Sequence, residues 1–300
     1  MDLASFSHGK RKVRIGKVRR RPNGVNEFVE YVVGVQLEGA TEASFTKGDN
    51  TMVVATDTVK NVCYVVAKRD DMNSPEEYGI TLARKFLDEY SFVTGVRVEA
   101  LEKPWSRAIV NGSEHVHGFL RGGQGEHVGY VEMRRLGSGI STSVEGRIEK
   151  LDVLKTTQSG WEKFYRDRYT VLPDTDERIL ATTVSVVWKL SQTQEVDYSS
   201  IYRTLLNCVY DGFFGDPKMG KYSPGVQNTQ YLIAHRMLEL VPEISEVSMV
   251  LPNIHFLPCT IPAFVKNKIQ FEDDVFIPTD EPQGEIRCTL KRPTSLRAKY

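Results

Sequence analysis

Polar side chains that could bind an anion or move protons follow an apolar run early in this chain. Residues 53–61 read VVATDTVKN, so Thr56, Asp57 and Thr58 fall between a strand-like run and the expected start of a helix. Capping is the simplest interpretation, because short polar side chains accept hydrogen bonds from the free N–H groups at a helix start. The same groups attract anions. The junction is therefore a predicted cap and a candidate ligand site.

Four further side chains have suitable chemistry, although each alone is more typical of a structural role. Asn253 and His255 lie two residues apart in LPNIH, so on a strand they point to the same side. Arg178 begins a predicted strand, where an arginine is usually part of a surface ion pair. Gln227 falls in the first turn of a predicted helix, where its side chain could simply bond to the backbone.

Two other patterns indicate weaker alternatives. His115 and His117 lie on the same side of a predicted strand and could supply half of a metal site, but no cysteine or further histidine lies nearby in the sequence. The basic run at residues 10–21 could bind phosphates. Its apolar residues alternate with charged ones, which favours a strand with one solvated face, and no glycine-rich phosphate loop follows.

Composition limits the classes of function. The 300 residues are 40% hydrophobic and 26% charged, and the formal net charge is zero. No global charge therefore attracts nucleic acid or a membrane surface. The sequence has neither an apolar run long enough for a membrane span nor an apolar signal core. The four cysteines are far apart and form no CxxC pair. They are expected to be reduced thiols in a cytosolic or peroxisomal setting.

The sequence pattern predicts that the elements positioning these residues occur twice along the chain. Residues 10–21 and 28–38 predict a long hairpin, residues 52–57 a strand that runs into a helix through residue 66, and Ser74-Pro75-Glu76-Glu77 the start of a second helix. Further strands are predicted at 94–102, 106–111, 116–120, 128–135 and 139–146.

The second half repeats this order of elements. A strand is predicted over 178–190, a helix over 197–214, a helix from Ser223-Pro224, and strands near 246–251, 254–257 and 286–290. Strands followed by helices predict the α+β class, with an antiparallel sheet covered by helices on one face in each half. We therefore expect two similar domains, at residues 1–140 and 141–300.

Taken together, the motifs resemble those of urate oxidase (uricase). The resemblance extends from His8 to about Cys288, and its most specific matches are VVATDTVKN at 53–61, VLKTTQSG at 153–160, DERILAT at 176–182, SPGVQ at 223–227 and LPNIH at 251–255. It implies tandem tunnelling-fold domains, a homotetramer around a β-barrel tunnel, and oxidation of urate by dioxygen and water to 5-hydroxyisourate and hydrogen peroxide. No metal or organic cofactor is expected.

The resemblance also implies a role for each candidate side chain. Three match the catalytic group that relays protons: Lys10, Thr56 and His255. Arg178 and Gln227 match the side chains that hold the purine edge, and a guanidinium and an amide suit the donors and acceptors of that edge. Other matching substrate contacts are Thr56, the backbone N–H groups of Asp57 and Val226, Asn253 beside dioxygen, and Trp161 as the stacking residue. The site is expected between subunits.

The sequence departs from the family pattern in three places. Trp161 stands where better-known members have phenylalanine, and Ile254 stands where many have lysine. The final tripeptide Ala298-Lys299-Tyr300 keeps the small and basic residues of a peroxisomal signal but lacks its leucine. The location is therefore expected to be peroxisomal or otherwise cytoplasmic. Two alternatives stay open: a catalytically silent purine-binding or assembly homologue, and a pterin- or purine-handling enzyme of the same fold.

Overall fold

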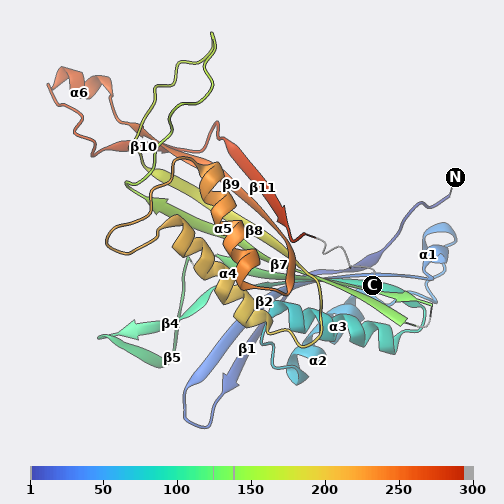
Figure 1. Cartoon of the computed structure of the whole chain (residues 1–300). Helices are drawn as coiled ribbons and strands as arrows, with labels where there is room; N and C mark the ends of the chain where they lie inside the picture. The colour runs from blue at the N-terminus through green and yellow to red at the C-terminus, as the bar shows by residue number, and fades with distance from the viewer. Residues whose placement is uncertain (1, 124, 138, 294–300) are drawn as a thin grey trace, which may run out of the picture. The chain divides into compact units, whose positions relative to one another are not determined.

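The computed structural model describes residues 2–123, 125–137 and 139–293 (Figure 1). By its internal contacts the chain divides into two compact units, and each is described here by itself. Unit 1 takes its residues from 1–149, 187–203 and 243–245; unit 2 takes its residues from 150–186, 204–242 and 246–300. The division of the chain at residue 140 stays a prediction.

Unit 1 is built on antiparallel strands. The predicted hairpin is confirmed, because β1 (His8–Arg20) pairs with β2 (Asn26–Gly39) and brings Ile15 opposite Tyr31. The strand order continues through β3 (Val93–Glu102), β6 (Glu126–Leu136) and the first part of β7 (Gly139–Lys155). A separate two-stranded ribbon contains β4 (Trp105–Val110) and β5 (Ser113–Arg121). A short helix, α1 (Glu42–Thr46), follows β2.

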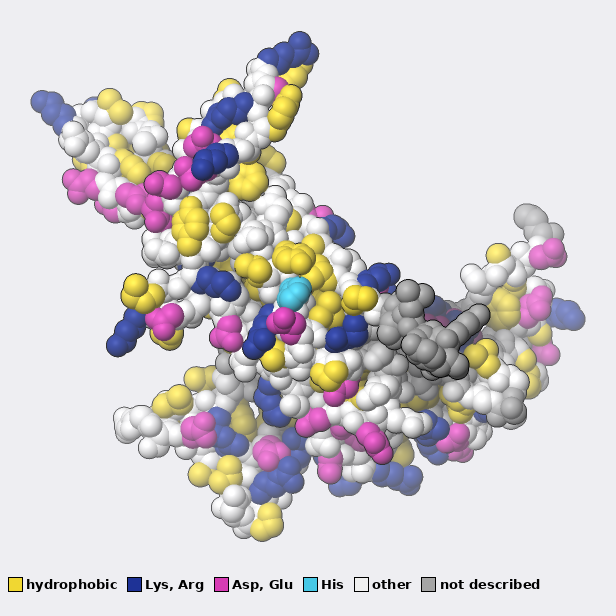
Figure 2. Space-filling view, in the orientation of Figure 1, with side chains coloured by type: hydrophobic (Ala, Val, Ile, Leu, Met, Phe, Trp, Pro, Cys, Tyr) yellow, Lys and Arg dark blue, Asp and Glu magenta, His cyan; other side chains and the backbone are white. Residues whose placement is uncertain are grey.

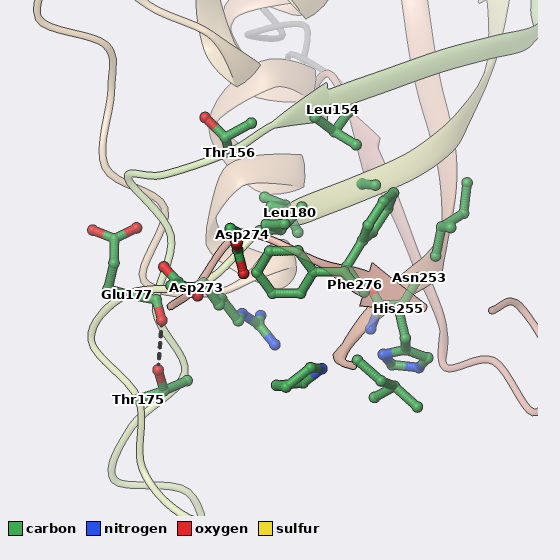
Figure 3. Close-up of a pocket in the computed structure, with 17 residues that line it drawn as sticks. Leu154, Thr156, Thr175, Glu177, Leu180, Asn253, His255, Asp273, Asp274 and Phe276 are labelled. Atoms are coloured by element: carbon green, nitrogen blue, oxygen red, sulfur yellow. Dashed lines mark hydrogen bonds between the residues drawn. The ribbon is translucent and has the colours of Figure 1, made fainter. Parts of the chain in front are cut away.

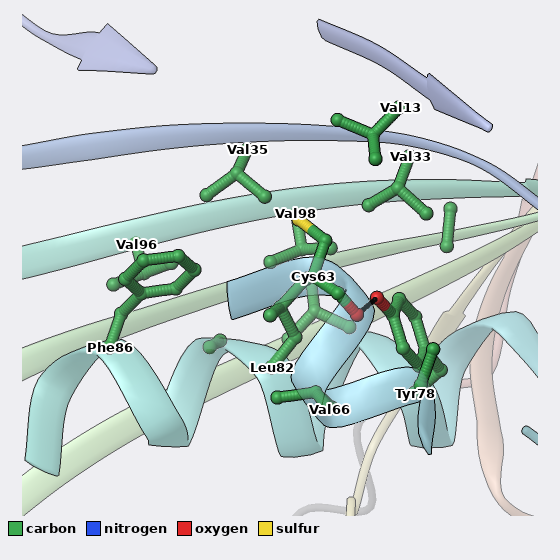
Figure 4. Close-up of a cluster of buried hydrophobic side chains, with 14 of the residues drawn as sticks. Val13, Val33, Val35, Cys63, Val66, Tyr78, Leu82, Phe86, Val96 and Val98 are labelled. Atoms are coloured by element: carbon green, nitrogen blue, oxygen red, sulfur yellow. Dashed lines mark hydrogen bonds between the residues drawn. The ribbon is translucent and has the colours of Figure 1, made fainter. Parts of the chain in front are cut away.

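Two amphipathic helices of unit 1 cover one face of these strands: α2 (Thr56–Arg69) and α3 (Pro75–Glu89). Alternate valines of β2 and β3 face Leu82 and Phe86 of α3, and these side chains are fully buried (Figure 4). The Tyr78 hydroxyl, also in this layer, donates a 2.9 Å hydrogen bond to the carbonyl oxygen of Cys63. The apolar face of α3 repeats with the helix period, and the apolar faces of the strands repeat every two residues. These faces therefore pack together in one core.

Unit 2 is also built of strands and helices, and several of its elements continue into unit 1. Its strands are the end of β7, most of β8 (Leu180–Leu190), nearly all of β9 (Ile244–Pro258), β10 (Phe276–Thr279) and β11 (Glu285–Lys291), and its helices are most of α4 (Tyr198–Phe213), α5 (Val226–Leu240) and α6 (Pro262–Lys266). Both β11 and β10 pair antiparallel with β9, at its first and last parts respectively. Residues 246–258 therefore belong to a single strand, where two short strands were predicted.

On the face shown in Figure 2, basic and acidic side chains are mixed without a large area of one sign, in keeping with the zero net charge. In the part of the chain that the structure describes, no helix is both long and apolar enough to cross a bilayer. The terminal tripeptide, residues 298–300, lies outside the described residues.

Candidate active site

The polar junction before α2 is not the continuation of a strand. Residues 53–55 have no strand partner, and the Val53 N–H instead donates to the Asn50 carbonyl oxygen at 3.0 Å in a turn. The prediction of a strand over 52–57 was therefore wrong. The helix begins at Thr56 with Ala55 as its N-cap, and no side chain caps it. The capping interpretation was also wrong, and the first N–H groups of α2 have no side-chain cap.

Asp57 uses its carboxylate on its own helix. The carboxylate accepts hydrogen bonds from Lys60 and, at 3.1 Å, from Asn61. The bond from Lys60 is the main cause of a lowered pKa for Asp57, and the charge of Lys10 adds to the effect. Lys10 on β1 is thus near enough to act electrostatically on the start of α2. With the carboxylate occupied, the backbone N–H is the group of Asp57 that remains to bind a ligand.

A hydrogen bond also ties the start of β1 to this junction. The His8 ring nitrogen lies 3.1 Å from the carbonyl oxygen of Val54, two residues before Thr56. The strand register is irregular between Lys10 and Val13. Lys10 and the first turn of α2 are therefore brought into one part of unit 1, although the sequence separates them by more than forty residues.

In unit 2, a short extended segment at residues 158–161 joins three parts of the candidate site. The Ser159 carbonyl oxygen accepts from the Arg178 N–H at 2.8 Å, and the Gly160 N–H donates to the Ser223 carbonyl oxygen at 2.9 Å. Trp161 forms an isolated antiparallel bridge with Thr175. Backbone bonds thus hold the arginine, the tryptophan and the segment before α5 in a fixed arrangement.

The N-terminus of α5 faces the Trp161 ring. The helix begins at Val226 with Gly225 as its N-cap, two residues later than predicted, and no side chain caps it. A Cβ added at Gly225 would lie 2.8 Å from Cζ3 of Trp161 and 3.3 Å from Oε1 of Gln227. Glycine is needed here for close approach. On its other side, the Trp161 ring stacks on Phe164 with centroids 5.8 Å apart and planes 9° from parallel.

A cavity of 660 Å³ in unit 2 gathers Arg178, Asn253 and His255 (Figure 3). Asn253 and His255 both lie on β9 and both line this cavity. Phe276 of β10 also lines the cavity. No local sequence signal marks Phe276, because it reaches the cavity only through the pairing of β10 with β9.

Polar atoms in this cavity are left without partners. Nε of Arg178 and Oδ1 of Asn253 are buried and have no hydrogen-bond partner among the described residues. Burial lowers the pKa of Arg178, but a guanidinium stays charged in proteins. Since an unsatisfied buried polar group is costly, this donor and this acceptor are suited to a polar ligand.

The histidine pair of the β4–β5 ribbon is a poor metal site. The rings of His115 and His117 lie 4.4 Å apart, edge to face. Among the described residues, however, no three His, Cys, Asp or Glu side chains are grouped closely enough to hold an ion. Two imidazoles on an exposed ribbon supply too few ligands.

Comparison with known proteins identifies the family. The sequence model of the family described as Uricase matches residues 6–132 and 144–287. The chain belongs to the uricase family. The protein named Uricase-2 from Phaseolus vulgaris is 44% identical over 293 residues, covering 95% of this chain and 94% of the relative. The Arabidopsis thaliana protein named Uricase is 40% identical and covers 96% and 95%.

Solved uricase structures share the fold. The crystal structure of uricase from Arthrobacter globiformis superposes with a TM-score of 0.85 at 35% identity, covering 100% of this chain and 98% of that one. The α+β tunnelling fold expected from the sequence is therefore confirmed. The family match also includes every candidate residue named above, because all of them lie within the matched ranges.

The candidate residues fall into two groups. Lys10, Thr56 and Asp57 belong to unit 1. The remaining six belong to unit 2: Trp161, Arg178, Val226, Gln227, Asn253 and His255. Sequence reasoning gave no role to two further residues of unit 2, Lys155 and Ser223, although both lie inside the family motifs VLKTTQSG and SPGVQ.

Proposed function

We propose that this chain is a urate oxidase. The reaction consumes urate, dioxygen and water and produces 5-hydroxyisourate and hydrogen peroxide, so that urate gives two electrons to dioxygen. Membership of the uricase family supports this activity. One observation carries it in the structure: three side chains from distant parts of unit 2, Arg178, Asn253 and His255, line one cavity. Two buried polar atoms of that cavity have no hydrogen-bond partner among the residues that the structure describes.

The substrate-binding roles follow from the chemistry of urate, a planar anion. Arg178 would donate to one edge of the purine and the Gln227 amide would bond to the opposite edge. The free N–H groups at the starts of α2 and α5, from Asp57 and Val226, would add donors at two positive helix ends. Trp161 would stack on the ring.

The proton-transfer roles belong to three residues. The Lys10 amine would accept a proton from urate through the Thr56 hydroxyl. The His255 imidazole would move protons between the attacking water and the peroxide that forms. Asn253 would hold dioxygen, and later water, above the ring. Electrons come from the substrate, so we expect turnover in metal-free buffer without an added cofactor.

We further propose a homotetramer whose active sites lie between subunits. Thr56 and Asp57 of one subunit would meet Arg178 and Gln227 of its neighbour. Exposed apolar side chains support the assembly, among them Tyr165 and Val171 on the segment between Trp161 and Thr175. Large apolar side chains with this much exposure are suited to burial at an interface. A peroxisomal location, suited to peroxide production, is also a proposal.

Urate turnover tests the activity directly. Purified protein is mixed with urate in aerated metal-free buffer, and urate absorbance and peroxide are followed. Loss of urate with matching peroxide is expected. A folded tetramer that leaves urate unchanged would contradict the proposal, and binding of urate without turnover would support the silent homologue.

Two variants separate proton transfer from binding. Lys10→Met should lower kcat by more than a hundredfold while anaerobic urate binding stays nearly unchanged, because the amine acts on a proton. Arg178→Ala should instead weaken binding by about tenfold or more, because it removes a charge-assisted bond. If Lys10→Met abolished binding, the lysine would be a binding residue and the proposed relay would be wrong.

A further inference from the structure

Lys155 is the last residue of β7, and its side chain points away from the cavity. Its neighbours Leu154 and Thr156 both line the cavity, as Figure 3 shows. Successive side chains of a strand point to opposite faces. Lys155 therefore extends toward the segment that precedes α5.

The Lys155 amine is bound to that segment. Its Nζ donates to the carbonyl oxygen of Lys221 at 2.7 Å and to Oγ of Ser223 at 2.8 Å. The Nζ also lies 5.4 Å from the centroid of the Phe213 ring. Both oxygens that accept from this ammonium are uncharged, one a carbonyl and the other a hydroxyl. The cation is held by neutral oxygens and an aromatic face.

Ser223 is the point through which this amine acts on the substrate-binding turn. Ser223 is buried, and its Oγ also accepts from the Thr229 hydroxyl at 2.8 Å. Its N–H donates to the Gln158 carbonyl oxygen at 2.9 Å. Two residues later comes Gly225, the N-cap of α5, followed by the proposed urate contacts Val226 and Gln227.

We propose that Lys155 is a positioning residue for urate, which holds the turn before α5 in its binding geometry and adds a positive charge beside that turn. This inference rests on the proposed urate oxidase activity. Charge-assisted hydrogen bonds are roughly twice as strong as neutral ones. Protonated Lys155 therefore holds Ser223 more firmly than the neutral amine, and its charge attracts the urate anion.

The environment makes this charge titratable near physiological pH. Burial, with a smaller effect of Lys221, lowers the pKa of Lys155 to about 8, while Glu177 opposes the shift. Lys221 comes from the turn before α5 and Glu177 from the segment before β8. As pH rises through about 8, Lys155 loses its proton, and the affinity for urate should fall.

Anaerobic urate binding tests the inference, because urate is not consumed without dioxygen. The dissociation constant is measured from pH 6.5 to 9.5 for the wild type, Lys155→Met and Lys155→Arg. At pH 7, Lys155→Met should bind about tenfold more weakly, which corresponds to one lost charge-assisted bond. The wild type should show a loss of affinity near pH 8 that Lys155→Met lacks. Lys155→Arg, which stays charged, should keep its affinity above pH 8.

Controls distinguish positioning from folding. Lys218→Met removes an exposed lysine of the same unit and should leave the whole binding profile unchanged. Under aerobic conditions Lys155→Met should raise KM and change kcat little. Equal urate affinity in folded Lys155→Met and the wild type would overturn the inference, as would a wild-type pH profile in Lys155→Arg. Absence of turnover in the wild type would instead overturn the proposed activity.

Discussion

Gly225 offers a test of the contact between the Trp161 ring and the start of α5. In Gly225→Ala the new Cβ would lie 2.8 Å from Cζ3 and 3.1 Å from Cε3 of Trp161, and 3.3 Å from Oε1 of Gln227. The φ of Gly225 is 170°, an extended conformation that alanine adopts without strain. The added methyl group therefore acts through the two side chains that it meets and leaves the backbone unstrained.

The size of the effect follows from these distances. Ordinary contact begins at 3.4 Å, so the tryptophan ring must move by several tenths of an ångström away from Gly225. The ring and the Gln227 amide are both proposed to hold urate. A misplacement of about 1 Å can cost about a hundredfold in rate. We therefore expect Gly225→Ala to lower kcat/KM by about ten- to a hundredfold in a protein that still folds.

A double-mutant cycle measures whether the clash is the cause. The phenyl ring of Trp161→Phe is smaller than the indole, so Gly225→Ala should cost much less in that background. Gly122→Ala, where the nearest atom would be Oγ of Ser106 at 3.6 Å, serves as a control outside the proposed site. An unchanged kcat/KM in Gly225→Ala, or the same loss in both backgrounds, would refute the reasoning.

Three predictions concern stability. Leu82→Ala leaves a cavity in the fully buried layer between α3 and the strands of unit 1. It should lower the free energy of unfolding, measured by urea titration, by about 2–5 kcal/mol. A loss below about 1 kcal/mol would mean that the neighbouring side chains fill the cavity. Tyr78→Phe removes the bond to Cys63 and should cost about 1 kcal/mol, whereas no cost in the same titration would show that bond to be unimportant. Side-chain hydrogen bonds, of which the one from Arg21 has the largest effect, lower the pKa of Glu27 from 4.5 to about 2. The stabilisation from this shift is fully present above pH 4.5 and is lost as the pH falls toward 2. The melting temperature of Glu27→Gln should therefore fall less in acid than that of the wild type. An identical fall in both proteins would argue against a stabilising ion pair at Glu27.

Local signals predicted the helices well. Ser74 caps α3, since its Oγ accepts from the N–H of Glu77 at 3.1 Å, and Pro75 occupies the first turn. Both features lie within four residues, so the sequence carries all the information that they need. The β1–β2 hairpin is similarly local, because one turn brings two alternating segments together.

Contacts between distant segments were not predictable in the same way. Residues 53–55 are apolar enough for a strand, yet a strand needs a partner, and none is available there. The bridge between Ser159 and Ser223 joins segments more than sixty residues apart. The role of Lys155 depends on that bridge. Family motifs marked these segments as special, but only the fold assigns the bonds between them.

The position of Trp161 has a consequence for spectroscopy. The chain has three tryptophans. Trp188 is fully buried, and the indole Nε1–H of Trp105 donates to a carboxylate oxygen of Glu30 at 2.8 Å. Trp161 is the one placed against the start of α5. A purine stacked on its indole would quench its fluorescence, while the other two tryptophans would emit unchanged. With tryptophan at the proposed stacking position, occupancy of the site would be followed by intrinsic fluorescence, without an added probe.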